Sequence, residues 1–147
     1  MSELLTLGVY QAIAENIDFP RTPFIDGKFR AGSGSMLKTR NPATNQLICE
    51  INACNADDVD FAVVKAREAF EQGRWSKVHP SDRKDVLIRL CKLLTRNRRE
   101  LAVMESLDSG KPIRDCETID LPETINTIKW HAEAIHKTQT HLSLIHI

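Results

Sequence analysis

After the first 20 or so residues, the hydrophobic period of this sequence changes once, near residue 54, and this change constrains the fold more than any other feature. Before it, short alternations of apolar and polar residues are separated by turn residues, which is typical of antiparallel strands. After it, apolar residues recur every three or four positions, which predicts amphipathic helices. Because strands and helices do not alternate, the helices cannot form a dinucleotide-binding fold by themselves. The predicted class is α+β, with antiparallel strands first and amphipathic helices after them.

The amino-terminal third predicts a loosely amphipathic helix over residues 4–17, followed by two strand pairs. In PFIDGKFR, Asp26-Gly27 can adopt the two positive φ angles of a type I′ turn, so a β-hairpin is expected. MLKTR and QLICEINA form the second pair around the turn NPATN. Alternation in the latter strand places these side chains on one face: Leu47, Cys49, Ile51 and Ala53.

Capping residues divide the remaining sequence into helices. Asn55 can cap the first helix, which ends at Gly73, and Pro80 suits the first turn of the second. A capping box of Asn97 and Glu100 then starts a third helix, which ends at Gly110, and Pro122 lies in or near the first turn of the last. The apolar positions are, helix by helix, Val59, Val63, Ala66 and Phe70; Val86, Leu87, Leu90, Cys91 and Leu94; Leu101, Met104 and Leu107, which face inward; and Ile125, Ile128, Ala132 and Ile135.

Charge and cysteine content limit the partners. Twenty lysines and arginines balance twenty aspartates and glutamates, so no net field favours nucleic acid or an anionic membrane surface. The amino terminus has no basic region before its short apolar run, so we expect neither a signal peptide nor a membrane span. The cysteines contain no CxxC pair, which favours reduced thiols in a cytoplasmic protein.

The residue patterns alone identify no active site. The glycines of AGSGS have no third glycine at a helix start, so a loop is favoured over a phosphate cradle. Cys49 and Cys91 occupy apolar-face positions and are expected to be buried. Cys116 lies beside Asp115 and Glu117, whose charges oppose thiolate formation, so an ordinary, partly exposed thiol is expected.

We also expect structural roles for two histidines and for a group of basic residues. His131 and His136 are five residues apart and point to different helix faces, unlike the i, i+4 pair of a zinc site. A basic patch has no interleaved aromatic residues, so a solvated helix surface is favoured over nucleic-acid binding. This basic patch comprises Arg89, Lys92, Arg96, Arg98 and Arg99.

Longer stretches resemble a known family. ELAVMESLDSGKPIRD, followed by INTIKWHAEAIHK, is similar to the amino-terminal part of NAD(P)-dependent aldehyde dehydrogenases. FIDGKFR and the stretch from TRNPATNQ to DRKDVLIRL match the opening strands and helices of that family in the same order. SGKPI and IKWHAEAIHK are most similar to the branch that oxidises γ-glutamyl-γ-aminobutyraldehyde in putrescine degradation. Betaine-aldehyde and broad-specificity branches stay open as alternatives.

The resemblance implies an activity for the complete protein. A cysteine thiolate attacks the aldehyde, hydride passes to NAD or NADP, and a glutamate-activated water hydrolyses the thioester. The implied complete fold is α/β, in a homo-oligomeric enzyme, a dimer or tetramer. None of Cys49, Cys54, Cys91 and Cys116 matches the family's nucleophile motif, and its base and cofactor motifs are expected beyond this chain. We therefore assign no catalytic or cofactor-binding residue and expect the chain alone to be inactive.

The resemblance also implies an ion site. Some members bind a monovalent cation, K⁺ or Na⁺, through the two residues before NP and the Asp of LD[ST]GK, which here are Thr39, Arg40 and Asp108. The first two residues would offer backbone carbonyls and Asp108 a negative charge, as a hard cation prefers. The alternative is that Asp108 only caps the helix or forms a salt bridge near its end.

The expected organisation has three parts. Residues 1–18 are an amino-terminal extension, 19–137 are the amino-terminal part of the aldehyde dehydrogenase domain, and 138–147 are a tail outside the family. Codons for LSLIHI resemble a transposon end used as a sequencing adapter, so we expect the reading frame to leave the gene near residue 142.

The alternative to an enzyme fragment is a genuine short protein that acts as a non-catalytic oligomerisation or interaction module. The observation that favours it is that apolar helix stripes lack obvious partners. Either form predicts poor solubility or a loosely packed monomer.

Overall fold

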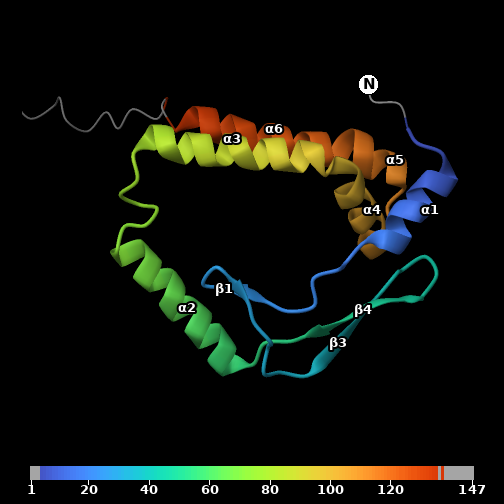
Figure 1. Cartoon of the computed structure of the whole chain (residues 1–147), viewed down its shortest axis with the longest axis horizontal. Helices are drawn as coiled ribbons and strands as arrows, with labels where there is room; N and C mark the ends of the chain where they lie inside the picture. Colours follow the sequence, from blue (N-terminus) through green and yellow to red (C-terminus); the bar gives the residue numbers. More distant parts are fainter. Residues whose placement is uncertain (1–3, 136, 138–147) are drawn as a thin grey trace, which may run out of the picture.

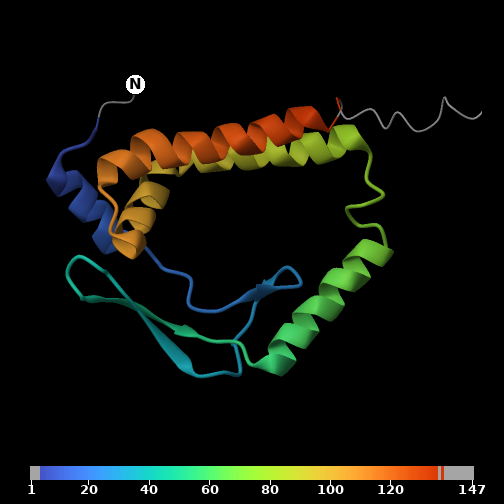
Figure 2. The same ribbon diagram turned by 180° about the vertical axis from the view of Figure 1, so that it is seen from behind.

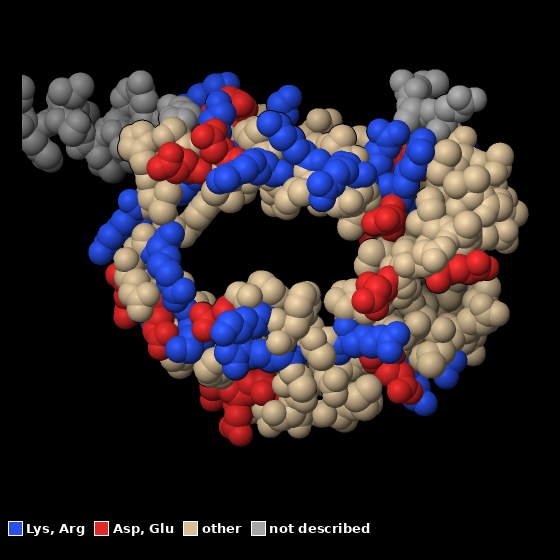
Figure 3. All heavy atoms as spheres, viewed as in Figure 1, with Lys and Arg blue, Asp and Glu red and all other residues tan. Residues whose placement is uncertain are grey.

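The computed structural model describes residues 4–135 and 137, and its elements form an open ring. Helices α3 and α6 lie along one edge, α2 stands at one end, and the strands run along the opposite edge (Figure 1, Figure 2). The space-filling view leaves a wide opening at the centre (Figure 3). In chain order the elements are α1 (Leu7–Asn16), β1 (Phe24–Ile25), β2 (Lys28–Phe29), β3 (Met36–Arg40), β4 (Leu47–Asn52), α2 (Ala56–Glu71), α3 (Pro80–Arg96), α4 (Arg98–Ser109), α5 (Ile113–Asp115), the π-helix η1 (Cys116–Asp120) and α6 (Leu121–Ala134).

The first strand pair is the predicted hairpin. Strand β1 pairs antiparallel with β2, and Phe24 lies opposite Phe29. Asp26 and Gly27 have φ angles of 54° and 74°, as a type I′ turn requires. The two phenylalanine rings meet edge to face, with their centroids 5.0 Å apart. This contact stabilises a hairpin of only two residues per strand.

The second strand pair follows the prediction in topology and departs from it in one detail. Strands β3 and β4 are antiparallel, and a bulge separates the pairs Thr39–Cys49 and Arg40–Leu47. Cys49 is buried as expected, whereas Leu47 is 48% exposed. The bulge interrupts the two-residue alternation of the ladder, so Leu47 does not share the burial of Cys49.

Helix α2 has the predicted cap and an uncovered apolar stripe. The Asn55 side chain accepts the Asp58 N–H at 2.9 Å, and the Asp58 carboxylate accepts the Asn55 N–H at 3.0 Å. Within the stripe, Val63 is 61% and Phe70 is 62% exposed. No residue of α2 is buried, because nothing among residues 4–135 covers this face.

Helices α3 and α6 form an antiparallel pair. The Cys91 thiol donates to the Ile125 carbonyl at 3.6 Å, and Lys84 Nζ lies 2.9 Å from a Glu133 carboxylate oxygen. Hydrogen bonding to Lys84 lowers the pKa of Glu133. These contacts join the two ends of the pair and explain why Cys91 is buried, as the sequence predicts.

The break between α3 and α4 lies at Asn97, as predicted, but the predicted capping box is wrong. The Asn97 side chain makes no capping hydrogen bond. Its backbone N–H still bonds the Leu93 carbonyl, and its φ of −99° and ψ of 17° differ from the extended cap conformation. Asn97 ends one helix while it begins the next, so its side chain is not placed to cap.

A small core lies where α4, η1 and α6 meet. Ala102 and Cys116 are fully buried and contact Leu121, with Leu101 and Ile113 packed around them. The expectation that Cys116 is partly exposed is therefore wrong. In the π-helix the Leu121 N–H bonds the Cys116 carbonyl, and this wider turn directs the thiol into the core.

Within the described part of the chain, no helix combines the length and the apolar composition needed to cross a membrane.

Candidate functional site

A cavity between the strands and α4 contains two of the residues expected to bind a cation. Its volume is about 390 Å³. Thr39 lines it from β3, Asp108 from the last turn of α4, and Glu105 from the turn before. Arg40 is not among the described residues that line it. The Arg40 guanidinium donates to the Asn45 carbonyl at 2.8 Å, beyond the β-bulge.

The charge around Asp108 fits a cation in part. A carboxylate near the carboxyl end of a helix is unfavourable, because it adds to the negative pole of the helix dipole. No described cation forms a salt bridge with Asp108, since the nearby Lys111 bonds Asp120 instead and its pKa is raised by that bond. Asp108 and Glu105 supply the oxygen atoms that a hard cation prefers.

A zinc site is built from a cluster of His, Cys, Asp or Glu side chains. Among the described residues, no group of three or more His, Cys, Asp or Glu side chains could hold a metal ion. The cavity of Thr39 and Asp108 therefore differs from a zinc site, which is built from such groups.

The cysteines of the described chain do not form a nucleophilic site. Cys49 and Cys91 are buried, as predicted. Burial raises the pKa of the Cys116 thiol, and the nearby carboxylates of Asp120 and Glu105 raise it further. A catalytic thiol needs the opposite shift, toward the thiolate, and access to solvent or substrate.

The AGSGS segment is a loop, as predicted, and its groups do not fit a dinucleotide phosphate. A Cβ on Gly32 would lie 2.2 Å from the Ala53 carbonyl oxygen, so glycine is required for the backbones to approach. The Ser33 N–H donates to the Asp58 carboxylate at 2.7 Å, and this bond is the largest cause of the lowered pKa of Asp58. A carboxylate thus occupies the donors that a phosphate would need.

The histidines and the basic patch have the following surroundings. The His131 ring meets Trp130 edge to face at 4.9 Å, and His136 lies outside the described residues. The exposed members of the basic patch, Arg89, Lys92 and Arg96, belong to α3, over which Lys and Arg gather in Figure 3. The other members, Arg98 and Arg99, turn toward Glu117.

The sequence did not predict a buried polar cluster around Glu117. It comprises Glu117, Tyr10, Arg98 and Arg99. Glu117 is 2% exposed and accepts a hydrogen bond from the Tyr10 hydroxyl. The Nε atoms of Arg99 and Arg98 lie 3.6 Å and 3.9 Å from its other carboxylate oxygen. Burial raises the pKa of Tyr10, and its hydrogen bond to Glu117 raises it further. The cluster anchors α1 to η1 and to the start of α4.

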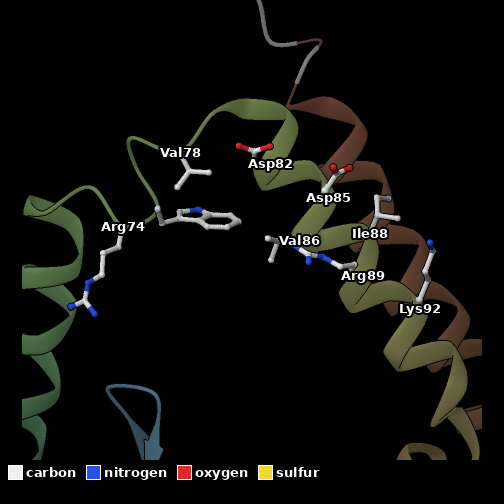
Figure 4. A pocket seen from close by; sticks show the side chains of 9 residues that line it. Arg74, Val78, Asp82, Asp85, Val86, Ile88, Arg89 and Lys92 are labelled. Carbon is white, nitrogen blue, oxygen red and sulfur yellow. The ribbon is translucent and has the colours of Figure 1, made fainter.

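A second unpredicted feature is a cleft between α3 and the segment that joins it to α2. We call it the Trp75 cleft, and its volume is about 570 Å³. Figure 4 shows its charged and apolar side chains. Its lining residues are Arg74, Trp75, Val78, Asp82, Asp85, Val86, Ile88, Arg89 and Lys92. The sequence signal that could have found it is the i, i+4, i+7 spacing of Asp85, Arg89 and Lys92 on one helix face.

The chain is similar to known proteins in both sequence and structure. The model of the aldehyde dehydrogenase family matches residues 29–144. An aminoacetaldehyde dehydrogenase of Pseudomonas aeruginosa is 55% identical over 138 residues, which are 93% of this chain and 28% of that protein. The chain thus spans little more than a quarter of the length of this relative.

Two solved structures are also similar. A γ-glutamyl-γ-aminobutyraldehyde dehydrogenase from Burkholderia cenocepacia matches with a TM-score of 0.87 and 36% identity, over 90% of this chain and 27% of that chain. An indole-3-acetaldehyde dehydrogenase in complex with NAD⁺ matches with a TM-score of 0.89 and 36% identity, over 92% of this chain and 28% of that chain. The described fold is therefore that of the amino-terminal elements of such enzymes.

Proposed function

The chain belongs to the aldehyde dehydrogenase family, and from this we propose that it is the amino-terminal part of an enzyme that oxidises an aminoaldehyde. The observation that carries the proposal is the 55% identity to an aminoacetaldehyde dehydrogenase. The structural similarity to a γ-glutamyl-γ-aminobutyraldehyde dehydrogenase supports the same substrate class. The substrate is γ-glutamyl-γ-aminobutyraldehyde or a similar aldehyde with an amino-derived group.

The reaction converts an aldehyde, water and NAD(P)⁺ into a carboxylate, NAD(P)H and two protons. The nicotinamide cofactor accepts hydride from the substrate when it is bound. The described residues of this chain supply neither the thiolate nor the phosphate-binding loop. Their part is to build the amino-terminal elements, and the chain alone is expected to be inactive.

The organisation proposed for the complete protein keeps the expected boundaries. Residues 1–18 are the extension, which contains α1, and 19–137 belong to the dehydrogenase domain. The expected tail over 138–147, including the adapter-like stretch from about residue 142, lies outside the described residues. We further propose a cytoplasmic homo-oligomer, a dimer or tetramer, with NAD or NADP as cofactor. A neighbour bound to NAD⁺ supports the cofactor class.

The activity is tested by comparing the 147-residue chain with the complete protein encoded at the same locus. The substrates are aminoacetaldehyde, γ-glutamyl-γ-aminobutyraldehyde and betaine aldehyde, with propanal as the control that lacks an amino group. We expect the complete protein to reduce NAD⁺ or NADP⁺ fastest with one of the first two and the short chain to give no turnover. A preference for propanal would overturn the substrate class, a preference for betaine aldehyde would favour the betaine-aldehyde branch instead, and turnover by the short chain would overturn its inactivity.

We also propose that the cavity of Thr39 and Asp108 holds K⁺ or Na⁺. The support is that two carboxylates, of Asp108 and Glu105, line it beside Thr39. We expect the melting temperature to be higher in KCl or NaCl than in tetramethylammonium chloride of equal ionic strength. Asp108→Asn should remove that difference, whereas the control Asp57→Asn, on α2, should keep it. An equal melting temperature in all three salts would refute the site.

A further inference from the structure

The Trp75 cleft has charges of opposite sign at its two ends. Asp82 and Asp85 lie in the first turns of α3, and Arg89 and Lys92 follow one to three turns later. At 1.5 Å per residue, Asp85 precedes Arg89 by about 6 Å and Lys92 by about 10 Å along the helix axis. The cleft therefore runs from a negative end to a positive end over the length of a small molecule.

The wall between these ends is apolar. It combines the Trp75 indole, from the segment before α3, with Val78, Val86 and Ile88. Trp75 is 45% exposed and Val86 is 40% exposed, so both remain available for contact. Figure 4 shows Val86 between the acidic and basic side chains of α3.

The four charged side chains are not used within the described structure. All four are exposed, and none forms a salt bridge with another residue in the part of the chain that the structure describes. Arg74, the remaining charged residue of the cleft, instead lies 3.9 Å from Asp26 of the hairpin. In Figure 4 its side chain points away from α3. The charges that face the cleft are thus two carboxylates at one end and two cations at the other.

We propose that the Trp75 cleft binds a small zwitterion whose ammonium and carboxylate groups are separated by a short methylene chain. The ammonium group lies between Asp82 and Asp85, where the indole face also attracts a cation. The carboxylate is bound by Arg89, whose planar guanidinium suits a carboxylate, and by Lys92. The methylene chain contacts Trp75 and Val86.

The charges of the cleft favour a zwitterion over a nucleotide or a simple amine. A nucleotide would place phosphates within reach of two carboxylates, and a simple amine would leave Arg89 and Lys92 without a partner. The link to metabolism rests on the proposed function, because oxidation of an aminoaldehyde keeps the amine and creates a carboxylate. The cleft would thus recognise the chemical class of the reaction product.

Binding is measured on the 147-residue chain carrying Trp130→Phe, so that Trp75 is the remaining tryptophan. Trp130 is 67% exposed on α6 and would otherwise contribute to the emission. The probes are 4-aminobutanoate and 6-aminohexanoate, with butylamine and butanoate as controls that carry one charge each, all at equal ionic strength. We expect a saturable change of Trp75 emission with at least one zwitterion and about fivefold weaker binding of either control.

Two charge variants complete the test. Asp85→Asn and Arg89→Gln should each weaken zwitterion binding about fivefold, because each removes one exposed ionic contact. The matched control Arg114→Gln, an exposed cation on α5, should leave binding unchanged, and far-UV circular dichroism checks that each variant is folded. A control amine that binds as well as the zwitterions, no saturable response, or two variants without effect would each overturn the proposal. The assay needs no turnover, so its outcome is independent of the dehydrogenase test.

Discussion

Helices α2 and α3 are nearly equal in length, 16 and 17 residues, and both carry an apolar stripe, yet only α3 has a partner. Helix α3 packs along α6 and buries Cys91, whereas no residue of α2 is buried. An apolar stripe therefore predicts that a helix forms, but it does not identify the element that packs against the stripe. In this chain the cohesive region is the group α3, α4, η1 and α6, and α2 lies outside it.

The strongest test of this comparison removes an apolar side chain from each region. Leu121→Ala, in the small core, should lower the free energy of unfolding by about 3 kcal/mol, because it leaves a cavity beside Ala102 and Cys116. Val63→Ala, on the exposed stripe of α2, should change it by less than about 0.5 kcal/mol. Urea unfolding followed by far-UV circular dichroism measures both. Equal losses in the two variants would show that α2 is as well packed as the core.

The next test concerns the polar contacts of the cohesive region. Glu117→Gln should lower the free energy of unfolding by about 2 kcal/mol, because Arg98 and Arg99 lose their buried counter-charge. The matched control is Glu123→Gln, an exposed residue in the first turn of α6, which should have almost no effect. A stability equal to that of the parent chain would mean that Glu117 is merely tolerated and does not anchor α1.

These two tests also separate what the sequence could predict from what it could not. The Asp26-Gly27 turn and the Asn55 cap were predictable, because each depends on residues within three positions. The contact of Tyr10 with Glu117 joins residues 107 positions apart, and no local signal links them. Cys116 was misjudged for a related reason, since it lies in a π-helix that packs against α4 and α6, and no local signal predicts its burial there.

The two candidate sites also differ in how far the sequence could predict them. Thr39 and Asp108 came from a family resemblance, and the structure places both at one cavity, with Arg40 outside its lining. The Trp75 cleft needs the segment after α2 to fold back on α3, which the sequence does not reveal. Spacing on one helix can be read from a sequence, but the opposing wall of a site cannot.

A smaller effect is expected from the cap of α2, and it should be local. Asn55→Ala removes the side-chain acceptor of the Asp58 N–H and should destabilise α2 by about 1 kcal/mol. Because α2 is poorly coupled to the core, amide exchange should quicken in Ala56–Glu71 and stay unchanged in α3 and α6. Faster exchange throughout the chain would contradict the separation of the two regions.

The smallest expected effect is a shift in the ionisation of Tyr10, which reports on the anchor of α1. Tyr10 is the single tyrosine of the chain, so the ultraviolet absorbance of tyrosinate measures its pKa directly. Burial and the bond to Glu117 should keep this pKa above the ordinary value of 10.0 in the folded chain and release it to that value in urea. A raised pKa means that folding favours the protonated phenol, so the contribution to stability is complete below pH 10.0 and is lost as the pH rises through the folded value. Glu117→Gln should lower the folded pKa toward 10.0, because it removes a negative charge next to the phenol, whereas Glu123→Gln should leave it unchanged. A Tyr10 that titrates at its ordinary pKa in the folded parent chain would show that α1 is not docked on the cohesive region.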